Sequence, residues 1–181
     1  MSTQEDVYEN TVVAKLIKII NQKLPRQQAE MLTKFVQQYY ASAAEEDLNS
    51  RDLLDLYGAV LSHWQFMSAR KPGEVKLRVY NPCFEQHGWQ SVHTIVEIAH
   101  DDMPFLVDSL LMALNRMGIN IHVVFHVGGM RVTRNKQHEV EQILMPKEAV
   151  PSGVTIYEEA PIFIEIDRQA DDPQLLNKIA N

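Results

Sequence analysis

The apolar residues change their spacing at Lys71-Pro72-Gly73, and this change divides the chain into two kinds of structure. Before this point they recur about every three to four positions, as one face of an α-helix requires. After it they alternate with polar residues, as on a half-buried β-strand. The sequence therefore predicts an α+β chain, with an N-terminal helical segment over residues 1–72 and a sheet domain over residues 73–181.

Three amphipathic helices are expected in the helical segment. Ser2 and Glu5 have the spacing of a capping box at the start of the first helix. Pro25 ends that helix, because the residue before a proline is pushed out of the helical region. The third helix is expected to begin near Ser50. The three apolar faces consist of Val12, Val13, Leu16, Ile17, Ile20 and Leu24; of Leu32, Phe35, Val36, Tyr39 and Tyr40; and of Leu53, Tyr57, Val60, Leu61, Trp64 and Met67.

From Gly73 onward the pattern predicts strand, helix, strand, further strands and helix, which is the order of a ferredoxin-like split βαβ layer. Its sheet is expected to be antiparallel or mixed, with helices on one face. Gly128-Gly129 predicts a tight hairpin, since glycine adopts positive φ at little cost. The strands are expected over Lys76–Asn81, Ser91–His100, Ile119–Val127, Met130–Thr133, Glu139–Leu144 and Ile162–Asp167, and the helices over Pro104–Met117 and from Pro173 onward.

The last helix is still continuing at Asn181, so we expect the chain to be a piece of a longer protein, truncated in this helix. A final strand of the layer would then be missing. The strand Lys76–Asn81 is expected to occupy the sheet edge that the missing strand leaves open.

The turn before the helix Pro104–Met117 carries two carboxylates, Asp101 and Asp102. Carboxylates at a helix start accept hydrogen bonds from free backbone N–H groups, so both are expected to cap this helix. Asp108 falls inside the helix, where it would cap, face solvent or point into a pocket beside the turn.

The same turn and its flanks resemble the ACT module, a small domain that often senses amino acids in metabolic enzymes. The residues that carry this resemblance are Asp102, Pro104, Leu106, Leu110, Leu114, Gly118 and Ile119-Asn120-Ile121. The ACT turn usually has glycine after the proline, where this chain has Phe105. A bulky side chain there is expected to occupy the place of an amino-acid ligand.

Three wider stretches, Asp52–Pro82, Asp102–Val127 and Pro161–Leu176, resemble the N-terminal region of the large bacterial NAD-specific glutamate dehydrogenases. The resemblance implies a parent enzyme that oxidatively deaminates L-glutamate to 2-oxoglutarate and ammonia with NAD. It also implies that the catalytic machinery lies outside this chain, which would serve regulation, assembly or both. An independent amino-acid-sensing module and a stand-alone enzyme using His and Asp on the open sheet face are the alternatives.

No catalytic residue and no cofactor site is expected in this chain, and NAD is expected only for the parent enzyme. The seven glycines nowhere form the G-x-G-x-x-G fingerprint of a dinucleotide site. Cys83 and His87 have nothing that fixes them as a nucleophile and its base. The candidate effector-binding or interface residues are Asp101, Asp102, Met103, Pro104, Asp108, Asn120 and His122.

Four polar residues, His93, Glu97, His122 and His126, are expected on the sheet face opposite the apolar one. His122 and His126 are separated by about 13 Å of strand, which is too far for one metal ion. No metal site is therefore expected. This polar face is expected to meet another domain or subunit.

The charge of the chain bears on its partners. With 17 basic and 24 acidic residues its net charge is −7, which opposes binding to a phosphate backbone, so no nucleic acid is expected. No apolar run approaches the ~18 residues of a membrane span. The single cysteine, Cys83, suits a reducing cytoplasm. The expected partners are the remainder of the parent chain, further copies in a homo-oligomer and an amino-acid effector.

Overall fold

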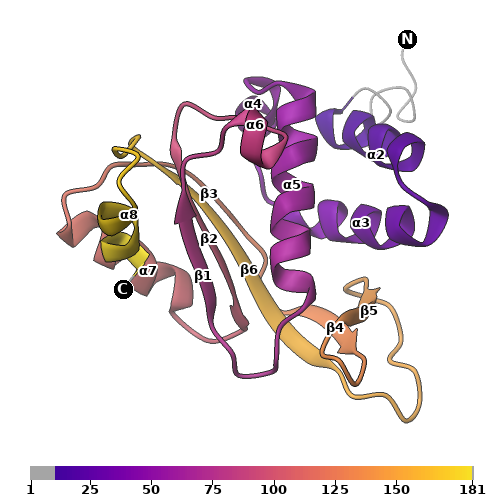
Figure 1. Ribbon diagram of the computed structural model, residues 1–181. Helices are drawn as coiled ribbons and strands as arrows, with labels where there is room; N and C mark the ends of the chain where they lie inside the picture. The colour runs from indigo at the N-terminus through magenta and orange to yellow at the C-terminus, as the bar shows by residue number, and fades with distance from the viewer. Residues whose placement is uncertain (1–10, 181) are drawn as a thin grey trace.

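The computed structural model describes residues 11–180, which form a sheet with helices on both faces (Figure 1). The capping box expected at Ser2 and Glu5 lies outside the described residues. The helices are α2 Val12–Lys23, α3 Arg26–Tyr39, α4 Glu45–Asn49, α5 Leu53–Ser68, α6 Phe84–His87, α7 Leu106–Arg116 and α8 Pro173–Ala180. The strands are β1 Lys76–Tyr80, β2 Thr94–Asp101, β3 Ile121–His126, β4 Met130–Arg134, β5 Val140–Leu144 and β6 Tyr157–Ile166.

The three predicted helices of the N-terminal segment are confirmed as α2, α3 and α5. Thr11 caps the start of α2, because its hydroxyl accepts a hydrogen bond from the N–H of Ala14, and this helix ends before Pro25. Asp52 caps the start of α5, because its carboxylate accepts from the N–H groups of Leu54 and Asp55. The short helix α4 was not predicted, because one turn is too short to show a helical period. The same reason applies to the four-residue helix α6, which was not predicted either.

All strand pairs of the sheet are antiparallel, in the order β1-β2-β6-β4-β5, with β3 also paired to β6. β1 lies at the sheet edge beside β2, so the expected edge position of this strand is confirmed. The α+β, ACT-like fold is therefore confirmed. β6 was predicted only from Ile162 onward, but it begins at Tyr157 and is 10 residues long.

The prediction of a hairpin at Gly128-Gly129 is wrong. β3 and β4 do not pair with each other. They follow one another along the same edge of β6, with Phe125 opposite Phe163 and Met130 opposite Glu159. Gly129, at φ 67°, belongs to the irregular link between the two strands. The length of β6 explains the error, because it offers pairing positions for both strands in succession.

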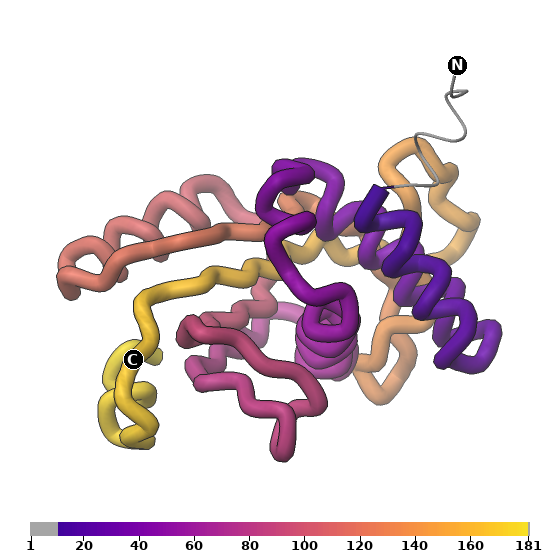
Figure 2. The backbone as a smooth tube through the Cα atoms, turned by 90° about the horizontal axis from the view of Figure 1, so that it is seen from above, coloured from indigo at the N-terminus to yellow at the C-terminus, as the bar shows by residue number. Residues whose placement is uncertain are grey.

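The two faces of the sheet bury different sets of residues. α7 and α8 lie on one face, over Val96, Ile98, Ile162, Ile164 and Ile166. α2, α3 and α5 lie on the other, over Ile95, Ala99, Phe125 and Phe163. Figure 2 shows α5 end-on, with α8 to one side and α2 and α3 to the other. The face expected to meet another domain or subunit is thus covered by helices of the same chain.

Within residues 11–180, no helix combines the length and the apolar character that crossing a membrane requires.

Gly58 lies in the interior of α5, where glycine costs about 1 kcal/mol relative to alanine. The structure gives the reason for it: a Cβ at Gly58 would lie 2.4 Å from the Cβ of Trp89. We therefore expect Gly58→Ala to destabilise the protein by about 1–3 kcal/mol, because overpacking outweighs helix propensity. Urea unfolding followed by circular dichroism measures this change.

Gln65→Gly, at an exposed position of the same helix, is the control that calibrates the intrinsic cost of glycine in α5. A Gly58→Ala variant more stable than the wild type would show that Trp89 does not require the close approach.

Candidate functional site

The seven candidate residues from the sequence do not form one site. Asp102, Met103 and Asp108 line a pocket at the turn before α7. Pro104 is exposed in the same turn. Asp101 points away into an ion network, and Asn120 and His122 lie at the opposite end of β6.

The pocket at the turn has a volume of about 280 Å³. The Asp102 carboxylate faces the Gly128-Gly129 link: a Cβ built on Gly129 would lie 3.5 Å from it. Within residues 11–180, the carboxylates of Asp102 and Asp108 have no hydrogen-bonding partner. The lining residues are Asp102, Met103, Phe105, Leu106, Val107, Asp108, His126 and Ala160.

The expected capping of α7 by Asp101 and Asp102 is wrong. The residue at the N-cap position is Phe105, which makes no side-chain capping bond and has the left-handed φ of 62°. α7 therefore begins at Leu106, two residues later than predicted. Phe105 lines the pocket, but 76% of its surface is exposed. A non-glycine residue at positive φ is uncommon and strained, and such strain often marks functional sites.

Asp101 belongs instead to a buried ion network at the end of α5. Its carboxylate accepts hydrogen bonds from Arg70, at 2.5 Å, and from the N–H of Gly73, at 2.8 Å. Arg70 and Arg134 both pair with Glu159, and these three side chains are fully buried. Burial raises the pKa of Asp101, but the hydrogen bond from Arg70, the charge of Arg70 and the hydrogen bond from the N–H of Gly73 together outweigh burial and hold the pKa below its usual value.

Asn120 and His122 together hold Asp167, the residue that follows β6. The carboxylate of Asp167 lies 2.7 Å from Nε2 of His122 and 2.6 Å from Nδ2 of Asn120. The bond to His122 and that to Asn120 lower the pKa of Asp167. These two candidate residues therefore serve the local structure at the end of β6.

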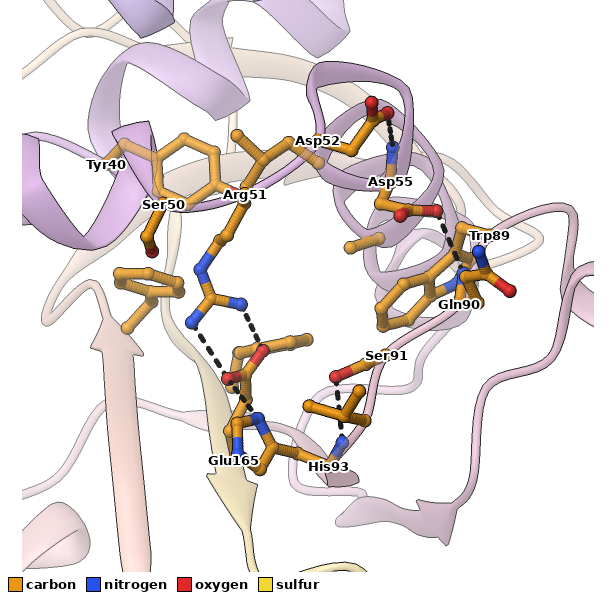
Figure 3. Close-up of a pocket in the computed structure, with 15 residues that line it drawn as sticks. Tyr40, Ser50, Arg51, Asp52, Asp55, Trp89, Gln90, Ser91, His93 and Glu165 are labelled. Carbon is orange, nitrogen blue, oxygen red and sulfur yellow. Dashed lines mark hydrogen bonds and ion pairs between the residues drawn. The ribbon is translucent and has the colours of Figure 1, made fainter.

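The structure contains a second pocket that the sequence did not indicate, a cavity of about 470 Å³ (Figure 3). It lies between the start of α5, the loop before β2, and strands β3 and β6. Buried aromatic side chains line it, together with three carboxylates and one arginine. Its lining residues are Tyr40, Ser50, Arg51, Asp52, Asp55, Leu56, Ala59, Trp89, Gln90, Ser91, Val92, His93, Phe125, Phe163 and Glu165.

A buried ion pair closes one side of this cavity (Figure 3). Both oxygens of Glu165, which is fully buried, accept hydrogen bonds from the guanidinium of Arg51, and His93 lies 3.2 Å from one of them. Burial lowers the pKa of Arg51, but the hydrogen bond to Glu165 and the negative charges nearby, that of Glu165 above all, together raise it above its usual value. A sequence signal for this pair existed: Glu165 interrupts the apolar run of β6, and a buried carboxylate requires a cation.

Of the four polar residues expected on one sheet face, His126 lies apart from the others and lines the pocket at the turn before α7. Glu97 is fully buried and paired with Arg78 and Tyr80, whereas His93 stacks on His122 with ring centroids 4.2 Å apart. No cluster of three or more His, Cys, Asp or Glu residues suited to a metal ion occurs within residues 11–180. The alternative of a stand-alone enzyme required an open sheet face for its His and Asp residues. Helices of the same chain cover this face, so that requirement is not met.

Cys83 and His87 do come together, with Sγ 3.8 Å from Nδ1. The same Nδ1, however, accepts a hydrogen bond from the N–H of Cys83 at 3.1 Å. His87 therefore closes the turn of α6, which accounts for the contact without a nucleophile.

Comparisons with known proteins agree with this fold. Residues 35–181 match a family model described as the ACT1 domain of glutamate dehydrogenase. The NAD-specific glutamate dehydrogenase of Halomonas elongata is 40% identical over 157 residues, which is 86% of this chain. That of Pseudomonas aeruginosa is 40% identical over 144 residues, or 80% of this chain. The chain spans only 9% of the length of each relative. No solved structure matches it.

We expect Glu165→Gln to destabilise the protein by about 3 kcal/mol or more, because removing one partner of a buried pair leaves an uncompensated charge. Urea unfolding of the variant measures the change. Glu30→Gln is the control, since Glu30 forms an exposed pair with Arg26 and exposed pairs contribute little. Equal losses of stability in the two variants would contradict the larger contribution expected of the buried pair.

Proposed function

The chain belongs to the family of glutamate dehydrogenase ACT1 domains, and from this premise we propose that it serves regulation and assembly in an NAD-specific glutamate dehydrogenase. The parent enzyme would pass a hydride from L-glutamate to NAD and yield 2-oxoglutarate and ammonia. The observation that carries the proposal is the match over residues 35–181, combined with a span of only 9% of each relative. The chemistry is therefore assigned to other parts of the parent enzyme.

The surface of α7 and β3 supports the assembly role. β3 pairs with β6 on one side, and among residues 11–180 no strand pairs with its other edge. Unpaired strand edges and exposed apolar side chains favour contact with further protein. The exposed apolar residues in and beside α7 are Met103, Phe105, Met112 and Met117. The proposed partners are the remainder of the parent chain and further copies in a cytoplasmic homo-oligomer.

The non-catalytic role is tested by incubating this chain alone with L-glutamate and NAD. We expect no formation of NADH, because the chain has no dinucleotide fingerprint. The complete glutamate dehydrogenase of Pseudomonas aeruginosa is the positive control for the assay. NADH formation proportional to the concentration of the chain would overturn the proposal.

The pocket at the turn supports a second candidate function, which is the sensing of an amino acid. Asp102 and Asp108 line this pocket, and their carboxylates are free of partners within the described part of the chain. A carboxylate pair of this kind attracts the ammonium group of an amino acid. Phe105, with its strained backbone, lines the same pocket.

Calorimetry with a panel of amino acids tests the sensing function. We expect a dissociation constant on the order of micromolar for at least one amino acid, and loss of its binding in Asp102→Ala. Glu46→Gln, which removes an exposed carboxylate of α4 that lines neither pocket, should leave that binding unchanged. Silence across the panel would leave the chain as a scaffold without a sensor.

A further inference from the structure

The cavity beside α5 has the properties of a ligand site, and this inference does not depend on the proposed function. Its volume of about 470 Å³ falls within the range of about 300–1,000 Å³ usual for small-molecule sites. Tyr40, Trp89, Phe125 and Phe163 form apolar walls, and each is at most 5% exposed. Val92, at the rim, is 79% exposed, so the cavity opens to solvent.

The charges around the cavity are unequal. Three carboxylates, those of Asp52, Asp55 and Glu165, line it, against the single guanidinium of Arg51. Arg51 is already neutralised by Glu165. The other two carboxylates have no cationic partner among residues 11–180, so the lining carries an excess of negative charge.

Asp55 is the carboxylate best placed to receive a ligand. Its Oδ1 accepts a hydrogen bond from the N–H of Gln90 at 3.0 Å. Its Oδ2 has no partner within the described residues. Figure 3 places Asp55 and Trp89 on one side of the opening, across from Arg51 and Glu165.

An anionic ligand is disfavoured at the same place. The start of α5 would attract an anion through its free N–H groups. Asp52 already occupies this position, because its carboxylate accepts from the N–H groups of Leu54 and Asp55. A second anion would meet Asp52 and Asp55 without any unpaired cation to hold it.

We propose that this cavity binds a small organic cation: a primary ammonium compound with an aromatic or apolar body. The ammonium group pairs with Asp55, and the body packs among the four aromatic side chains. Aromatic faces also attract a cation directly, which adds to the selectivity for positive charge.

Three probes that share one phenolic body test the sign of the charge by calorimetry: tyramine, tyrosol and 4-hydroxyphenylacetate carry a cationic, a neutral and an anionic end. We expect tyramine to bind about tenfold more tightly than tyrosol, and 4-hydroxyphenylacetate to bind most weakly. Tighter binding of the anion, equal binding of all three, or no binding of tyramine at about 10 mM would overturn the proposal, since millimolar affinity is the weakest that it allows.

Two charge-matched variants locate the site. Asp55→Asn retains an oxygen for the N–H of Gln90 but removes the charge, so we expect it to weaken tyramine binding about tenfold and leave tyrosol binding unchanged. Glu46→Gln removes an exposed carboxylate of α4 that does not line the cavity, and it should change neither affinity. A tyramine affinity unchanged by Asp55→Asn, or weakened as much by Glu46→Gln, would contradict the assignment.

Discussion

Strands β2 and β6 carry three buried carboxylates, and each of them is paired with an arginine. They are Glu97, Glu159 and Glu165. A buried glutamate without a cationic partner would destabilise the protein by several kcal/mol. Each of these glutamates therefore requires an arginine beside it in the folded structure. Arg51 and Arg70 flank α5 at its two ends and bind Glu165 and Glu159 of the same strand, β6. Two ion pairs therefore hold α5 along β6 and fix the helical segment on the sheet.

This anchoring makes the helical segment an integral part of the sheet domain. α5 is followed by β1, and β1 completes the sheet edge beside β2 with five residue pairs, from Lys76 opposite Ala99 to Tyr80 opposite Ile95. Residues of α2, α3 and α5 share one hydrophobic core with Ile95, Phe125 and Phe163. The family match agrees, since it begins at residue 35, inside α3, and includes both α5 and β1.

Local patterns in the sequence were sufficient to predict the longer helices and strands, but not the ion pairs or the cavity. The apolar periods located α2, α3, α5 and the strand β1, because each has enough residues to display its period. The pairing of Asp101 with Arg70 spans 31 positions and that of Glu165 with Arg51 spans 114, so neither can be read from neighbours in the sequence. The cavity was not predicted for the same reason, because its lining residues come from five separate stretches of the chain.

The two pockets lie at opposite ends of the anchored helix. The start of α5 lines the cavity with Asp52, Asp55 and Leu56. Its end leads into Arg70, which holds Asp101, the neighbour of Asp102 in the turn pocket. A ligand in either pocket would add its contacts beside one of the two ion pairs that fix α5 to β6. Each pocket is therefore next to one of the two ion pairs that position α5 on β6.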